Sequence, residues 1–73
     1  MSQEIIAPLS GKIIKINVGV KSSVADDDEL FVIEAMKMET SVYAPCSGRI
    51  NKILVKVGEE VEEDEVLAVV ETT

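Results

Sequence analysis

Polar and hydrophobic residues alternate along much of this chain, as they do in β-strands. Residues 14–20 and 50–57 each place Ile and Val at every second position, a period that predicts a half-buried strand. Residues 30–33 and 66–70 are short apolar runs, which are typical of fully buried strands. Val and Ile dominate all four stretches, and both fit pleated surfaces. The pattern therefore predicts an all-β protein.

The chain also contains an internal repeat. A shift of 37 positions aligns residues 7–36 with residues 44–73 without a gap, and 14 of the 30 pairs are identical. Chance would give about two identities in a chain of this composition. The chain is therefore a duplicated half-unit, and since two copies are too few for a solenoid, we expect a closed structure with a pseudo-two-fold axis.

Turn signals divide each half into strands. Both copies carry Ala-Pro-x-Ser-Gly, at 7–11 and 44–48, which predicts a turn that includes the glycine. Ile13 and its equivalent Ile50 are out of phase with the alternation that follows them, which predicts a bend or a β-bulge early in the strand. We expect about four short strands in each half and two sheets that face each other.

The junction between the two copies breaks this pattern. Residues 34–40 read Glu-Ala-Met-Lys-Met-Glu-Thr, all but the last good helix formers. The flanking residues are strand-like, and the segment is too short for a stable helix. We predict a tight hairpin, although the Asn-Gly or Asp-Gly that favours such turns is missing. Conflict between local propensity and fold indicates a functional site.

Composition excludes several classes of function. The 73 residues form one domain, 1–73, with 7 basic and 14 acidic side chains and a net charge of −7. We therefore expect no binding to nucleic acid and no insertion into a membrane. The chain has no histidine and one cysteine, Cys46, so we expect no metal site, no catalytic nucleophile–base pair and no internal disulfide. The free thiol predicts a reducing, cytoplasmic location.

Two features have ordinary structural interpretations. The acidic stretches 26–29 and 59–65 overlap under the shift, and we interpret them as solvated loops, with an electrostatic face for a basic partner enzyme as the alternative. Cys46 stands at the position of Leu9 in the first copy, where we expect a small packing residue.

The junction is similar to the attachment motif of biotin carrier domains, Ala-Met-Lys-Met, in which the central lysine receives biotin. The resemblance continues through three later stretches and covers essentially the whole chain. Related lipoyl domains carry Asp-Lys-Ala around their lysine, so the motif is specific. The motif residues are Glu34, Ala35, Met36, Lys37, Met38 and Glu39. The later stretches are Ala44-Pro45-x-Ser47-Gly48, Val57-Gly58-Glu59-x-Val61 and Val66-Leu67.

The resemblance implies a flattened barrel of two four-stranded antiparallel sheets, with the lysine on a hairpin tip. The repeat supports the same polarity, because a shift of 37 carries Lys37 to a point just beyond either chain end. The tip and the termini should therefore lie at opposite ends. The chain departs from the family at turns that usually hold glycine. Val20–Val24 replaces a Gly-Asp-x-Val turn, and Asp27 or Asp28 and then Asp64 replace later glycines.

The resemblance also implies a function. Biotin would be joined through an amide to Lys37 by a biotin–protein ligase. The ligase must also remove a proton, because a lysine amine is almost fully protonated at neutral pH and Glu34 and Glu39 favour the charged form. The chain would be a non-catalytic, monomeric carrier subunit. It would carry CO2 as carboxybiotin between biotin carboxylase or decarboxylase sites and a carboxyltransferase, in an acyl-CoA carboxylase, a decarboxylase or a transcarboxylase.

Three other interpretations stay open. The chain could be a lipoyl-type acyl carrier, although a methionine on each side of Lys37 speaks against it. It could be an auxiliary biotinylated protein without a carboxylase. It could also be a β-sandwich interaction module that uses its acidic face and carries no cofactor. The gapless repeat predicts no thumb-like insertion, and we expect a free-standing subunit or an excised domain.

Overall fold

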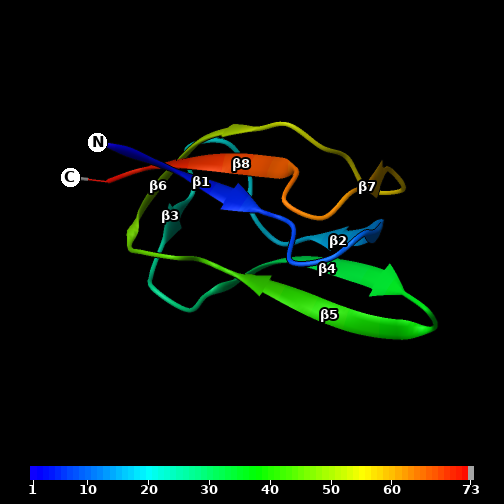
Figure 1. Cartoon of the computed structure of the whole chain (residues 1–73). Coiled ribbons are helices and arrows are strands. Elements are labelled where there is room, and N and C mark those ends of the chain that lie inside the picture. Colours follow the sequence, from blue (N-terminus) through cyan, green and yellow to red (C-terminus); the bar gives the residue numbers. More distant parts are fainter. Residues whose placement is uncertain (73) are drawn as a thin grey trace.

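Eight β-strands and no helix make up residues 1–72, the part of the chain that the computed structural model describes (Figure 1). Each half contributes four strands, which confirms the predicted all-β fold. The strands are β1 (Ser2–Ile6), β2 (Gly11–Ile16), β3 (Ser23–Val24), β4 (Glu29–Ala35), β5 (Met38–Tyr43), β6 (Gly48–Ile53), β7 (Glu60–Val61) and β8 (Val66–Glu71).

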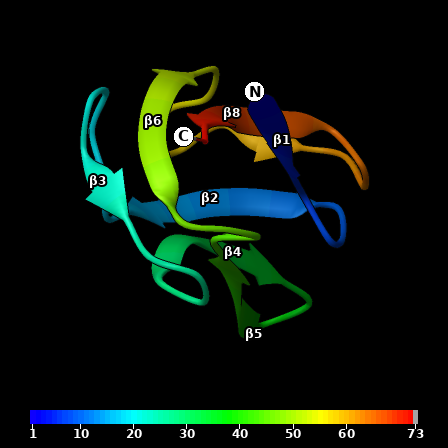
Figure 2. The same cartoon turned by 90° about the vertical axis from the view of Figure 1, so that its left-hand side faces the viewer.

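The strands form two antiparallel four-stranded sheets, which face each other in the end-on view of Figure 2. One sheet has the order β1-β8-β6-β3 and the other β5-β4-β2-β7. A shift of 37 positions converts each order into the other, as the predicted pseudo-two-fold axis requires. Each sheet takes two strands from each half. Four of the six strand pairings found in residues 1–72 therefore join one half of the chain to the other.

The two predicted bulges are present. The pairing of β2 with β4 shifts between Ile13 and Lys15, and the pairing of β6 with β8 shifts between Ile50 and Lys52. A further irregularity in the pairing of β4 with β5 skips Leu30. Because of this irregularity, the consecutive residues Leu30 and Phe31 both lie in the core, which simple alternation would not allow.

The predicted strands over 14–20 and 50–57 are too long. β2 and β6 end at Ile16 and Ile53. Beyond them the chain leaves its sheet and crosses to the other one, where β3 and β7 pair. The alternation persists in the two loops because one valine in each still contacts the core, while the next valine is more than half exposed.

The core between the sheets is almost entirely aliphatic and follows the repeat. Residues 1–72 bury no polar or charged side chain. Fourteen of the fifteen residues in the buried cluster form equivalent pairs, and the fifteenth is Val55. The pairs are Ile5 and Val42, Ala7 and Ala44, Ile13 and Ile50, Val24 and Val61, Leu30 and Leu67, Phe31 and Ala68, and Ile33 and Val70.

The acidic loops use some of their carboxylates to fix turns. Asp28 Oδ2 accepts a hydrogen bond from the backbone N–H of Ala25 at 2.8 Å. The equivalent Glu65 Oε1 accepts one from the N–H of Glu62 at 3.0 Å. Both carboxylates bond the backbone three residues earlier, as turn-forming acids commonly do. These contacts agree with the interpretation of the stretches as solvated loops.

The turns in which glycines were expected adopt left-handed backbone conformations. Lys21 has φ 74° and its equivalent Gly58 has φ 94°. Asp27 and Asp64 have φ 71° and 70°, so the turn residue of the first half is Asp27 and not Asp28. A lysine in this region is strained, because its Cβ approaches the following carbonyl oxygen. The symmetric fold imposes this conformation on whichever residue occupies the position.

We expect Lys21→Gly to stabilise the protein and Gly58→Ala to destabilise it. Relief of the left-handed strain outweighs the extra freedom of glycine in the unfolded chain, for a net gain of about 0.5 kcal/mol. Gly58→Ala should cost about 1 kcal/mol. Urea denaturation measures both, and Lys21→Ala controls for the lost charge. A Lys21→Gly protein less stable than Lys21→Ala would contradict the backbone explanation.

Candidate functional site

The hairpin of β4 and β5 projects from one end of the molecule, and both chain ends lie at the other (Figure 1). The molecule is 37 Å long and 18 Å across in the other two directions. At the terminal end, the backbone N–H of Thr72 donates to the carbonyl of Met1 at 2.6 Å. These two residues are the repeat equivalents of Ala35 and Met38, which close the hairpin. The predicted polarity is therefore present.

The hairpin turn contains only two residues. Ala35 and Met38 are the last paired residues, and Met36 and Lys37 between them have φ 52° and 67°. Two left-handed residues at the centre of a hairpin are typical of a type I′ turn, whose twist matches that of the strands. Non-glycine residues pay about 1–2 kcal/mol each for this conformation. The predicted tight hairpin is confirmed, and its strain is offset by the strand pairing on both sides.

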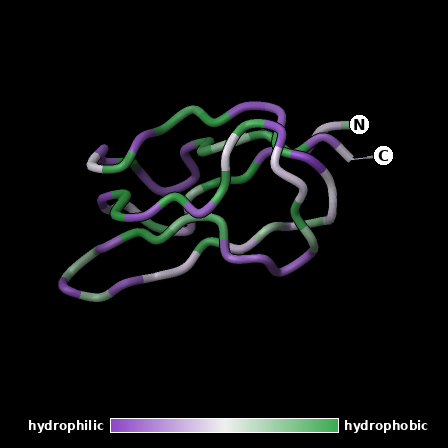
Figure 3. Tube along the Cα trace, turned by 180° about the vertical axis from the view of Figure 1, so that it is seen from behind, coloured by the Kyte–Doolittle hydropathy of each residue, from purple (hydrophilic) through white to green (hydrophobic). Residues whose placement is uncertain are grey.

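The residues of the motif project into solvent. Met36 and Met38 are 95% and 70% exposed, and Lys37 is exposed between them. Residues 1–72 contain one ion pair, which joins the N-terminal amine to Glu71 at the opposite end, so the Lys37 ε-amine has no carboxylate partner there. Figure 3 shows the hairpin extending away from both termini with mixed hydrophilic and hydrophobic colour. The amine is accessible to a partner protein from several directions.

The strand register brings the two glutamates of the motif together. Glu34 and Glu39 are directly opposite each other in the β4–β5 pairing, one pair before the turn-closing residues. Like charges in such a position are unfavourable. On the other side of β4, Lys12 of β2 is paired with Glu34. Stability alone does not favour a glutamate pair here, so its position beside the lysine suits contact with another molecule.

Gly11 supports the root of the hairpin. A Cβ atom at this residue would lie 2.6 Å from both the carbonyl oxygen of Glu34 and Cγ2 of Ile33. At the opposite end, a Cβ on Gly48 would lie 2.5 Å from the carbonyl oxygen of Glu71. The expectation that these two glycines are turn residues is wrong. They are the first residues of β2 and β6, and their missing side chains let two strands approach closely.

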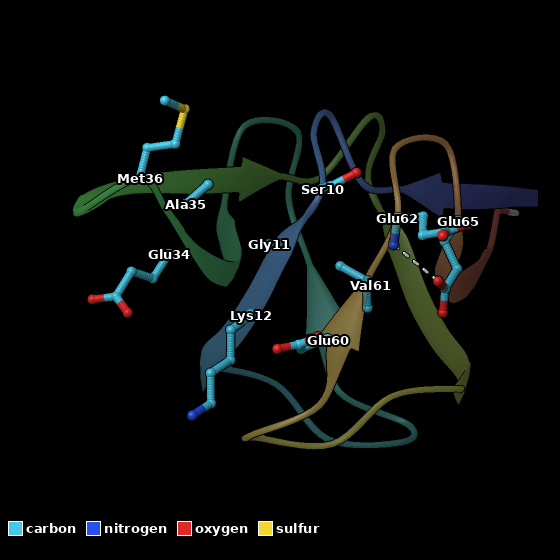
Figure 4. Close-up of a pocket in the computed structure, with 10 residues that line it drawn as sticks. All are labelled: Ser10, Gly11, Lys12, Glu34, Ala35, Met36, Glu60, Val61, Glu62 and Glu65. Atoms are coloured by element: carbon cyan, nitrogen blue, oxygen red, sulfur yellow. Dashed lines mark hydrogen bonds between the residues drawn. The ribbon is translucent and has the colours of Figure 1, made fainter.

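An open groove of about 860 Å³ lies between the hairpin and β7 (Figure 4). It contains four glutamates and one lysine, contributed by segments far apart in the chain. Sequence analysis missed this groove because only the folded chain brings the segments together. Two of its glutamates, Glu60 and Glu62, have Ser23 and Ala25 as repeat equivalents, so the fold itself does not require acids there. The lining residues are Ser10, Gly11, Lys12, Glu34, Ala35, Met36, Glu60, Val61, Glu62 and Glu65.

A small polar network holds the far end of the hairpin. The Ser41 hydroxyl of β5 donates to Glu29 Oε1 at 2.5 Å. Asn17 Nδ2 donates to Glu29 Oε2 at 3.0 Å. The hydrogen bond from Ser41 is the main cause that holds the pKa of Glu29 below its ordinary value, and Asn17 and the charge of Lys15 act in the same direction. The network joins β5, β4 and the loop after β2.

The other sequence features are structurally ordinary. Cys46 is a free, half-buried thiol that packs against the core, in agreement with the predicted packing role. Residues 1–72 hold no group of three or more His, Cys, Asp or Glu side chains placed to bind a metal ion. In the same residues, no helix of the length and apolarity needed to cross a membrane is found.

Comparisons with known proteins identify the family of this chain. Residues 3–70 match the biotin/lipoyl family described as "Biotin-requiring enzyme", and the chain belongs to this family. A solved structure of a single-chain, multi-domain long-chain acyl-CoA carboxylase matches 99% of the chain with a TM-score of 0.92 and 28% identity. The Kluyveromyces lactis urea carboxylase matches 97% with a TM-score of 0.90 and 34% identity.

The chain spans only 7% and 6% of the lengths of these two carboxylases. A comparison with curated proteins gives no match.

We expect Gly11→Ala to disturb the hairpin and Gly48→Ala to leave it unchanged. Each added methyl group overlaps a carbonyl oxygen and a side chain, so both should destabilise the fold by about 1–3 kcal/mol. Only Gly11→Ala displaces the strand that leads to Lys37. Amide chemical shifts of residues 34–39 should therefore move in Gly11→Ala alone. Equal movement in the Gly48→Ala protein would show that the hairpin responds to general loosening of the core.

We expect Ser41→Ala to raise the pKa of Glu29, and Asn17→Ala to raise it less. A carboxylate with a lowered folded-state pKa adds stability above its unfolded-state value, and this contribution is lost as pH falls through the folded-state value. Acidification should therefore weaken the native protein through Glu29, and Ser41→Ala should remove most of that effect. Carboxyl-carbon NMR titration measures the pKa directly. An unchanged Glu29 titration in Ser41→Ala would refute the assigned cause.

Proposed function

We propose that this chain is a biotin carboxyl carrier and that biotin is attached to it through an amide on Lys37. One observation carries the proposal: the lysine of an Ala-Met-Lys-Met motif occupies the exposed apex of a two-residue hairpin turn. Membership in a family of biotin-requiring enzymes supports the choice of group. The motif residues Glu34, Ala35, Met36, Met38 and Glu39 form the surface around the attachment point.

The geometry suits covalent attachment. An amide can form on the Lys37 ε-amine without moving any core residue, because neither Met36 nor Lys37 belongs to the buried cluster. No side chain of residues 1–72 forms an ion pair with this amine. The enzyme that delivers the acyl group, a biotin–protein ligase, would also remove the proton.

The carrier presents the group and leaves the chemistry to its partners. Bound biotin would supply the ability to hold a carboxyl group, and the protein residues would position it for other enzymes. Met36 and Met38 are unbranched and polarizable, so they suit contact with several different protein surfaces in turn. Because the group would be tethered to the carrier, its encounter with the second enzyme site would be intramolecular. The effective concentration is about millimolar for a short linker.

The proposed partners follow from the same reasoning. A biotin carboxylase or a decarboxylase would exchange the carboxyl group at one site, and a carboxyltransferase would exchange it at another. The likeness to a long-chain acyl-CoA carboxylase and a urea carboxylase supports this class of enzyme. The partner subunits would choose the acyl or keto substrate. A monomeric state and a cytoplasmic location stay predictions.

Incubation with a purified biotin–protein ligase, biotin and ATP tests the site. We expect one biotinyl group per chain, found by intact and peptide mass spectrometry on the peptide that holds Lys37. Lys37→Arg should abolish the addition, because a guanidinium group stays protonated. Lys21→Arg is a matched control, since Lys21 is also an exposed lysine with a left-handed backbone, φ 74° against 67°. The Lys21→Arg protein should be biotinylated to the same extent as the native chain.

The same measurement on the protein from its own host separates the alternatives. Biotin on the Lys37→Arg chain would refute the site. A lipoyl addition to Lys37 would make the protein an acyl carrier of 2-oxoacid chemistry. A lysine that is unmodified in the host and that also refuses biotin from the ligase would leave an interaction module. A biotinylated chain that purifies from its host without any carboxylase subunit would indicate an auxiliary biotinylated protein.

A further inference from the structure

The thioethers beside Lys37 are unusually accessible. Met36 is 95% exposed and Met38 is 70% exposed, and neither belongs to the buried cluster. Met36 is one of the two unpaired residues at the hairpin apex and has a left-handed backbone, with φ 52°. In Figure 4 Met36 lies at the outer end of the hairpin, on the rim of the groove that it helps to line. Exposure and thioether chemistry together set how readily a methionine is oxidised.

We propose that Met36 and Met38 are a reversible oxidation site that controls recognition of the Lys37 hairpin by the proteins that modify or use it. The inference rests on the proposed function, since it needs Lys37 to be the attachment site. It assigns the two methionines a role in regulation beyond contact with partners. The chemical class of the modifying agent is a peroxide, and that of the restoring agent is a thiol-dependent methionine sulfoxide reductase.

The oxidation step is balanced with one peroxide molecule. A lone pair on the methionine sulfur attacks a peroxide oxygen, the O–O bond breaks, and an S–O bond forms. The sulfur loses two electrons and hydrogen peroxide is reduced to water. Reduction returns the thioether and water while two thiols become a disulfide. The product side chain is polar and chiral in place of a flexible apolar one.

Oxidation of Met36 and Met38 should leave the packed core of the domain unchanged. Oxidation of a buried methionine would disrupt packing, whereas these two side chains make no part of the core. A partner that buries them would have to desolvate a sulfoxide oxygen without a matching donor, which costs free energy. Oxidation should therefore weaken recognition of the hairpin and leave the folded domain intact.

The chain supplies its own chemical control. The repeat equivalent of Met38 is Met1, which is 95% exposed, as Met36 is, and lies at the opposite end of the molecule. The chain's three methionines are therefore all exposed, and two of them flank the lysine. The distant thioether of Met1 is the internal control. Met36→Leu/Met38→Leu keeps the tip apolar and removes both reactive sulfurs.

The experiment uses the full, unbiotinylated chain treated with hydrogen peroxide, with catalase added before the ligase. Peptide mass spectrometry should find Met36 oxidised as fast as Met1, and Met38 more slowly. The ligase kcat/KM for the oxidised chain should fall at least tenfold, with an unchanged melting temperature. A sulfoxide reductase should restore the rate. Met36→Leu/Met38→Leu still contains Met1, so peroxide should oxidise Met1 in this variant and leave its ligation rate, whatever its value, unchanged.

Several outcomes would overturn the inference. Ligation of the oxidised chain at the untreated rate would show that the sulfoxides are tolerated. A lowered melting temperature would make the loss a folding effect. A peroxide-induced loss in the double leucine variant would place the cause elsewhere. All three leave the proposed function standing, because untreated protein is still biotinylated. Failure of the untreated chain to accept biotin would refute the proposed function, and the inference with it.

Discussion

Neither half of this chain can bury its own apolar side chains, and the structure follows from that constraint. Within one half, only β2 pairs with β4 or β6 with β8, and the other four pairings in residues 1–72 cross between halves. A single two-stranded ribbon is marginal at best in water. Interleaving the strands gives each half the neighbours it lacks and encloses one aliphatic core, with fourteen of fifteen members matched in pairs.

The same interleaving fixes the position of the lysine. Two consecutive copies related by a two-fold axis are joined by one connection. The two-fold axis relates this connection to the place where the two chain ends meet. The connection here is the β4–β5 turn, and the chain ends are joined by the hydrogen bond between Thr72 and Met1. A reactive group on the connection would therefore lie at the opposite end of a 37 Å long molecule from any attachment made through the termini. The polarity that a carrier needs is a consequence of duplication.

Features that repeat in the sequence could be predicted, and features that depend on register could not. The four strands of each half and the bulges after Ile13 and Ile50 follow from patterns present in both copies. The tight hairpin at Lys37 follows from the strand-like residues on both sides of a short segment. The pairing of Glu34 with Glu39 and the network around Glu29 depend on which strands become neighbours. The glycine at position 11 was misinterpreted because a turn signal and a close strand approach use the same residue. The strands over 14–20 and 50–57 were predicted too long because a valine in a loop can contact the core as a valine in a strand does.

The hairpin combines strain with independence from the core. Met36 and Lys37 occupy left-handed conformations that favour glycine, yet a glycine at either position would remove a side chain of the proposed attachment motif. The strand pairing from Ala35 down to Glu29 holds the turn closed against this strain. Because the six residues 34–39 bury no side chain, acylation of the amine or a change at a flanking sulfur alters the surface and not the packing. The domain is near the lower size limit for folding alone. Its tip costs stability through the two left-handed turn residues, but modification at the tip would leave the packed core unchanged.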